Sequence, residues 1–194
     1  MDNDNVLKDL FLMQQVYATL FSVYNKLQTE SDKHFVALSS RQYMTMLAIF
    51  HLPENETTIN NIAKKLGSTK QNTKQLITAL EKKGYIKLKP SDIDKRAINI
   101  SVTPSGINEM LKSGEIGIMF LADVFNEFTG EELQTLWDLM KKIYRFDGKE
   151  QDGFEDDPGE NNTMDEAAQE TQAKALQAFI DKRKKSVLER RDKT

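Results

Sequence analysis

A break of two residues, Gly67 and Ser68, separates two short segments that have helical periodicity. Thr58 is a candidate N-cap for the first segment, "INNIAKKL". Ser68 and Gln71 have the spacing of a capping box and open the second segment, "TKQNTKQLITALEKK", which Gly84 ends. Two short helices joined by so short a turn are typical of a helix-turn-helix, and we expect this motif over residues 58–84.

Two short stretches with alternating hydrophobicity follow, "YIKLK" and "AINISV". The alternation predicts two strands, because successive side chains of a strand point to opposite faces. The residues expected to face inward are Ile86, Leu88, Ile98, Ile100 and Val102, and those expected to face outward are Lys87, Lys89, Asn99 and Ser101. Pro90 and a polar loop join the two strands as a hairpin, so the sequence predicts a wing beside the helix-turn-helix.

Residues 5–28 carry an apolar stripe whose members recur at alternating spacings of four and three. This pattern is typical of a seam against another helix. The stripe consists of Val6, Leu10, Met13, Tyr17, Leu20, Tyr24 and Leu27. It can serve as core within one chain or as a seam between subunits, and we expect the seam.

Two further helices are predicted after the wing. Thr103 as N-cap and Pro104 at the first helical position open a long helix that should run to about Phe128. Thr129 and Glu132 form a second capping box, which opens a helix with an apolar stripe. These helices and residues 5–28 carry more apolar surface than the wing and helix-turn-helix can bury, which argues for a dimer. The candidate dimerisation residues are Val6, Leu10, Met13, Tyr17, Leu20, Leu136 and Met140.

The expected fold is therefore mostly α with a small β-hairpin wing, a winged helix-turn-helix plus a helical dimerisation layer. We assign residues 1–146 to this domain and about 38–103 to its reading head. Residues 147–166 are acidic, Gly-rich and poor in apolar side chains, which predicts a flexible linker. Residues 167–194 are predicted to form a C-terminal amphipathic helix of unknown role.

Charge is segregated along the chain, although the formal net charge is only -3. Residues 55–100 contain ten Lys or Arg against four acids, whereas residues 147–166 contain nine acids against one Lys. A localised basic face is what phosphate binding requires. We therefore expect DNA contacts in the basic region, and we expect the acidic linker either to compete with DNA for that region or to be a passive solubilising segment.

The candidate DNA contacts lie on the outer face of the second short helix and on the wing. The helix candidates are Ser68, Thr69, Lys70, Gln71, Asn72, Lys74 and Gln75, for which a solvated polar face is the simpler alternative. Lys64 and Lys65 are candidate contacts to the DNA backbone. Lys87, Lys89 and Lys95 are wing candidates, although lysines also protect hairpin edges from aggregation.

Residues 38–106 resemble the MarR family (multiple antibiotic resistance regulators). The resemblance is carried by "SSRQYMTMLAI", by "TINNIAKKLGSTKQNTKQLITALEKKGYI" and by the wing signature "DKR…SVTPSG". It implies that Arg96 reaches into the DNA minor groove while Asp94 orients a basic side chain beside it. An inserted Arg also suits the enhanced negative potential of a narrow minor groove.

The resemblance further implies a pocket for a small aromatic effector between the dimer layer and the reading head. Its candidate lining is Met13, Tyr17, Phe21, Met44, Phe50, Met110 and Met119. Stripes of Met and aromatic residues also form ordinary core, and both interpretations stay open.

Several classes of protein are not expected. The chain has no Cys, and His34 and His51 lack neighbours at metal-ligand spacing, so we expect no metal and no cofactor. We find no nucleophile elbow and no phosphate-binding Gly loop, and we expect no enzyme. Because no signal sequence or membrane span is evident, a cytoplasmic protein is expected.

The sequence as a whole predicts a homodimeric transcriptional regulator, a repressor, that binds double-stranded DNA at a pseudo-palindromic operator. The alternative is a winged-helix module for protein–protein interaction, in which the basic face meets an acidic partner and the C-terminal helix docks.

Overall fold

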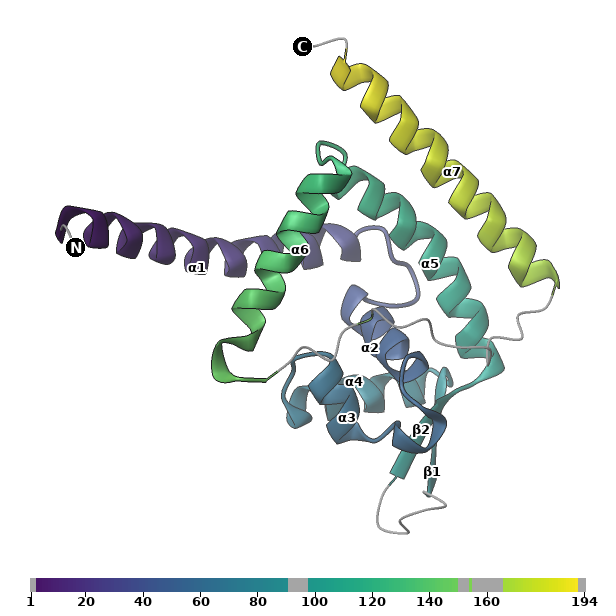
Figure 1. The fold of residues 1–194 in the computed structure, drawn as a ribbon. Helices are drawn as coiled ribbons and strands as arrows, with labels where there is room; N and C mark the ends of the chain where they lie inside the picture. The colour runs from purple at the N-terminus through teal and green to yellow at the C-terminus, as the bar shows by residue number, and fades with distance from the viewer. Residues whose placement is uncertain (1–2, 91–97, 150–153, 155–165, 192–194) are drawn as a thin grey trace. The chain divides into compact units, whose positions relative to one another are not determined.

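The computed structural model describes residues 3–90, 98–149, 154 and 166–191. Contacts divide the chain into two compact units, Met1–Ser40 and Arg41–Thr194. Helix α1 belongs to the first unit, and the helix-turn-helix, the hairpin and the later helices belong to the second (Figure 1). The described residues are mostly helical with one two-stranded antiparallel sheet, which confirms the predicted fold class.

Helix α1 spans Asn3–Asp32, so the helix predicted over 5–28 is confirmed and is longer at both ends. Every residue from 4 to 26 is exposed. The predicted stripe is included except for half-buried Leu27, with Val6 at 46% and Tyr17 at 67% exposed. The apolar surface of α1 is therefore not covered within its own unit.

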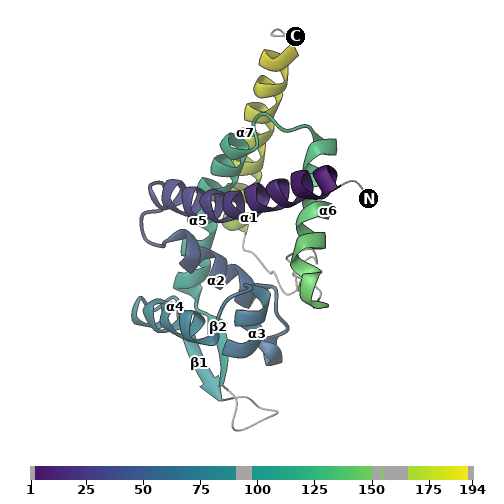
Figure 2. The same cartoon turned by 90° about the vertical axis from the view of Figure 1, so that its left-hand side faces the viewer.

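The reading head consists of three helices, a short 3-10 turn and the hairpin (Figure 2). Its elements are α2 at Ser40–Phe50, η1 at Glu54–Glu56, α3 at Ile59–Lys65, α4 at Lys70–Lys82, β1 at Ile86–Pro90 and β2 at Ile98–Val102. The buried core is drawn from all of these except η1, through Met46, Ile49, Ile62, Ile77, Leu80, Ile86 and Ile100. Because each helix of the head contributes to this core, α3 and α4 are held as one packed body.

The turn between α3 and α4 differs in one detail from the prediction. Gly67 has φ +58, a left-handed conformation that ends α3 at little cost for a residue without a Cβ. The Ser68 amide then donates to the Ala63 carbonyl at 2.9 Å, so Ser68 completes the end of α3. The predicted Ser68 N-cap is wrong, because Thr69 caps α4 by accepting from the Asn72 amide.

The wing forms the predicted antiparallel hairpin, in which Ile86 lies opposite Val102 and Lys89 opposite Asn99. The Ile100 amide donates to the Thr57 carbonyl and hydroxyl, which fastens β2 to the start of α3. Ile98 was expected to face inward but is 49% exposed, because it lies at the open end of the hairpin opposite Pro90.

Three helices follow the wing: α5 at Pro104–Val124, α6 at Gly130–Tyr144 and α7 at Glu166–Arg191, with the 3-10 turn η2 at Arg145–Asp147 after α6. Thr103 caps α5 as predicted, but α5 ends at Val124 rather than near Phe128. Gly106 is required because a Cβ there would lie 2.1 Å from the Tyr85 carbonyl oxygen. Helix α7 lies beside α5 (Figures 1 and 2).

Candidate nucleic-acid interface

The N-terminal half of α4 presents a polar face that its own packing points outward. Thr73, Ile77 and Leu80 are buried, which fixes the opposite side of the helix toward solvent. The Thr73 hydroxyl donates to the Thr69 carbonyl at 3.0 Å and adds to the hold on the first turn. The local sequence pattern therefore determines both the start of α4 and its rotation.

Six of the seven predicted contacts on α4 are exposed: Thr69, Lys70, Gln71, Asn72, Lys74 and Gln75, whereas Ser68 is half-buried. Lys70 and Lys74 lie four residues apart, as do Gln71 and Gln75, so each pair shares a strip of the helix surface. The face thus offers two ammonium groups and two amides side by side, the groups that bind phosphates and base edges.

The electrostatics of this region favour anions. Residues 57–80 contain Lys64, Lys65, Lys70 and Lys74 and no Asp or Glu. The N-terminus of α4 adds the positive end of its helix dipole. The first turn of the helix carries no acid that would cancel this field.

Lys64 and Lys65, adjacent in sequence, are placed differently. Lys64 is exposed, as a contact to the DNA backbone requires. Lys65 is only 8% exposed. Its ammonium lies 5.5 Å from the centre of the Phe154 ring, and that ring also meets His51 edge-on. Lys65 in this position does not reach the outer surface, in contrast to the predicted backbone contact.

The wing presents Lys87 and Lys89 as exposed side chains on the same face of β1. The remaining wing candidates, Asp94, Lys95 and Arg96, lie outside the described residues. The hairpin stem thus agrees with the predicted outward lysines, and the role of the three tip residues stays a prediction.

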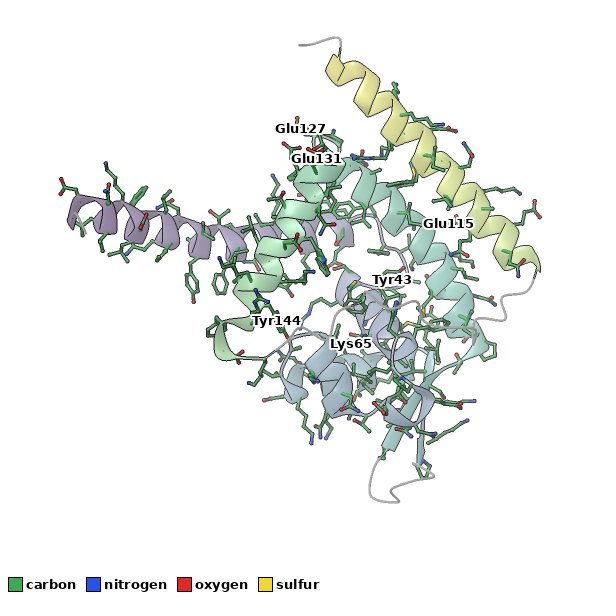
Figure 3. The ribbon with its side chains drawn as sticks, in the orientation of Figure 1. Tyr43, Lys65, Glu115, Glu127, Glu131 and Tyr144 are labelled. Atoms are coloured by element: carbon green, nitrogen blue, oxygen red, sulfur yellow. The ribbon has the colours of Figure 1, made fainter. Side chains whose placement is uncertain are left out.

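Two aromatic contacts to the reading head were missed by the sequence analysis. A Cβ placed on Gly67 would lie 3.4 Å from the Tyr144 hydroxyl oxygen, so the end of α6 rests on the turn between α3 and α4. Tyr144 and Lys65 are labelled in Figure 3. Phe154 was a detectable signal, because it is the single aromatic residue of the acidic stretch 147–166.

The candidate dimerisation residues are mostly exposed. The five on α1 all lie in its exposed stretch. On α6, Leu136 is half-buried and Met140 is 48% exposed, and none of the residues of α6 is buried. The two helices therefore leave apolar side chains uncovered within the described chain.

The candidate effector lining is divided between the two units. Met13, Tyr17 and Phe21 lie on α1, whereas Met44, Phe50, Met110 and Met119 belong to the second unit. Burial raises the pKa of Tyr43, whose hydroxyl faces Gly114 on α5. The effector pocket stays a prediction.

The described residues contain no group of three or more His, Asp or Glu side chains arranged to hold a metal ion. Within the same part of the chain, no helix is both long enough and apolar enough to cross a membrane.

Residues 38–97 match the model of the MarR family. The chain is 29% identical over 100 residues to the HTH-type transcriptional regulator PrsX of Escherichia coli, an alignment that covers 52% of this chain and 60% of PrsX. The chain thus spans about 60% of the length of the curated relatives that it matches.

Solved structures give the same fold. The MepR–DNA complex of S. aureus superposes with a TM-score of 0.60 at 23% identity, covering 66% of this chain and 96% of that one. The organohalide-sensing regulator RdhR in its 2,4-dichlorophenol-bound form gives 0.62 at 16% identity, covering 69% and 80%. The chain is thus a MarR-like winged helix-turn-helix protein, in which residues 38–97 match the family and about two thirds of the chain has its fold.

Proposed function

We propose that this chain is a homodimeric transcriptional regulator that binds double-stranded DNA sequence-specifically and acts as a repressor. Helix α4 enters the major groove, and the wing lies along the neighbouring minor groove with Arg96 inserted into it. The observation that carries this proposal is the exposed face of α4, which combines Lys70, Gln71, Lys74 and Gln75 in a stretch without acids.

The chemistry of this face divides the contacts into two kinds. Gln71 and Gln75 can donate to and accept from base edges, which carries sequence information. Lys64, Lys87 and Lys89 offer exposed ammonium groups for phosphates, which position the protein without reading sequence. Structural neighbours solved in complex with DNA, such as MepR, support the same use of the fold.

Dimerisation is proposed from the surface of α1. Val6, Leu10 and Tyr17 line one side of a helix on which every residue from 4 to 26 is exposed. A second copy can cover this side, and two copies related by a twofold axis would match a pseudo-palindromic operator. The half-sites should then lie about one helical turn, ~34 to 36 Å, apart.

A small aromatic effector is proposed as the ligand that regulates this dimer. RdhR was solved with a chlorinated phenol bound, which supports an aromatic ligand on this fold. In this chain Met44 is 38% exposed, and half-buried Phe50, Met110 and Met119 add apolar surface in the same unit.

A salt titration of the full chain with duplex DNA tests the proposal. Because each phosphate contact releases counterions, log K should fall linearly with log salt, and losing one contact should lower the slope by about one unit. Lys64→Gln should therefore weaken random and operator duplexes alike. Lys142→Gln, an exposed lysine on α6, is the matched control and should leave the slope unchanged.

A protein–protein interaction module predicts another result. Its basic face would bind an acidic protein, and protection mapping of genomic fragments would yield no preferred site. Binding to duplex DNA without any sequence preference, or no binding at low salt, would reject the proposed function.

A further inference from the structure

Helix α7 makes its closest polar contacts with the C-terminal end of α5. The Lys182 ammonium pairs with Asp123 at 2.5 Å and also donates to the Met119 carbonyl. The Arg183 guanidinium donates through two nitrogens, to the Phe125 carbonyl and, at 2.9 Å, to the Phe128 carbonyl. Two adjacent side chains of α7 thus bind four groups between Met119 and Phe128, three of which lie within residues 123–128.

The segment that receives them is acidic and ends a helix. We call residues 123–132 the corner, since they join α5 to α6; they contain four acids and no Lys or Arg. Glu127 and Glu131 gather at this corner in Figure 3. Phe125 is the C-cap of α5, where carbonyls lack helical partners and the helix dipole is negative. A cation with several N–H donors can both pair with the free carbonyls and balance the negative end of the helix dipole.

The docking helix has the complementary charge. Residues 182–185 read "KRKK", and Lys182 and Arg183 are half-buried whereas Lys184 and Lys185 are exposed. Phe179 and Ile180, one turn earlier, are half-buried as well. One side of α7 therefore combines apolar packing on α5 with two cations directed at the corner.

We propose that the corner is a docking site for a basic amphipathic helix, that α7 of the same chain occupies it, and that the docked α7 holds α6 in place on the helix-turn-helix. Arg183 fixes the two carbonyls that bound the turn into α6, and α6 ends with Tyr144 on Gly67. Docking at one end of α6 should thus steady the turn between α3 and α4 at the other. The contacts are partly exposed, with side-chain exposures of 32% for Lys182 and 62% for Asp123, so salt should weaken them.

The absence of Cys from the chain allows a direct test of docking. Asp123→Cys with Lys182→Cys, treated with a short bis-maleimide, should cross-link within one chain. The pair Asp123→Cys with Lys184→Cys is the control, because Lys184 faces solvent, and it should react far less. A covalent dimer would show that α7 docks on a second copy and would overturn docking within one chain. No cross-link, or equal yields for both pairs, would overturn the docking itself.

Amide hydrogen exchange of the full chain tests the effect on α6. Hydrogen bonds to a charged donor are lost in Arg183→Ala, so exchange of α7 and of residues 125–130 should rise about tenfold or more. Lys184→Ala removes the same charge one residue later and should change neither. The amides of Gly67 and Ser68, which bond to Lys64 and Ala63, should also exchange faster in Arg183→Ala.

Tyr144→Ala separates the two steps of the proposal. It should speed exchange at Gly67 and Ser68 while leaving α7 and the corner protected. If Arg183→Ala loosens the corner but leaves the turn between α3 and α4 unchanged, α7 docks without steadying the reading head and the second step is wrong. These measurements need no DNA, so their outcome is independent of the proposed function.

Discussion

The reading head buries its large apolar side chains, whereas helix α1 leaves its own exposed. In the head, Met46, Ile62 and Leu80 are fully buried, and helices and strands from one chain supply the whole core. In α1, residues as large as Phe11 and Tyr17 are 59% and 67% exposed. A helix with such a surface is costly to keep in water, since burying one large apolar side chain contributes about 1.5 to 3 kcal/mol.

The difference indicates which part of the chain buries its apolar side chains by itself and which part needs a partner. The core of the head is filled by its own helices and strands, and its exposed side chains are polar where α4 meets solvent. Helix α1 has apolar side chains on more than one side: Leu7 lies about 100° around the helix from Val6, and Phe11 about 100° from Leu10, at 3.6 residues per turn. Its stability should therefore depend on assembly.

The largest expected effect comes from placing a charge in the α1 seam. Leu10→Lys should abolish the dimer, because each seam residue is buried twice in a twofold assembly, which amounts to about 3 to 6 kcal/mol per dimer. Gln15→Lys introduces the same side chain about 140° around the helix from Leu10, outside the seam, and should leave the dimer intact. Sedimentation at micromolar concentration checks both. A monomeric wild-type chain would show that α1 does not need a second copy to cover its apolar side chains.

The second effect is expected in the core of the head. Leu80→Ala should lower the free energy of unfolding by about 2 to 5 kcal/mol, because it leaves a cavity among residues that cannot fully collapse. Thr78→Ala, on the exposed side of the same helix, should stay within about 0.5 kcal/mol. Urea denaturation at protein concentrations below the dimer dissociation constant measures the stability of the monomer and thus of the head. Equal losses in both variants would contradict the prediction.

A smaller effect is expected at the polar face of α4. Gln71→Ala should cost about 1 to 3 kcal/mol of discrimination between operator and random duplex, because a side-chain amide can pair with one base in two positions. Folding should be unaffected, since Gln71 is exposed. Competition binding measures the ratio of affinities. An unchanged ratio would mean that this face has been assigned wrongly.

The smallest effect concerns pH. Burial raises the pKa of Tyr43, so the neutral hydroxyl is favoured in the folded head. An unfolded tyrosine ionises near pH ~10, so the stability tied to Tyr43 is full below that pH and is lost as pH rises through the folded pKa. Tyr43→Phe should therefore lose less stability between about pH 9 and 11 than wild type does. Parallel stability curves would show that Tyr43 contributes nothing to this loss.

Local signals predicted most of the helix boundaries, because caps and stops act over three or four residues. Thr58, Thr103 and Thr129 cap the helices that they were expected to cap. The predicted N-cap of α4 was wrong because two neighbouring residues can fill that position. Ser68 and Thr69 can both cap α4, and the end of α3 takes Ser68, which leaves Thr69 for the cap.

Burial was less predictable wherever it depends on residues far apart in the chain. Periodicity placed Ile98 inward, but its position at the open end of the hairpin leaves it exposed. The exposed face of α4 was predicted correctly because Thr73, Ile77 and Leu80 define the opposite face within the same helix. The burial of Lys65 was not predicted, because the Phe154 ring that lies against it is 89 positions away in the sequence.

The sequence by itself determined the helix-turn-helix, the hairpin stem and the donor-rich face of α4, since these depend on side chains a few residues apart. Only the tertiary structure decided that Lys65 is withdrawn from the surface and that Arg183 binds the carbonyls of Phe125 and Phe128. A backbone carbonyl is the same group in every residue, so no pattern of letters marks which ones a distant guanidinium will reach. That pairing exists only once packing has brought α7 beside α5.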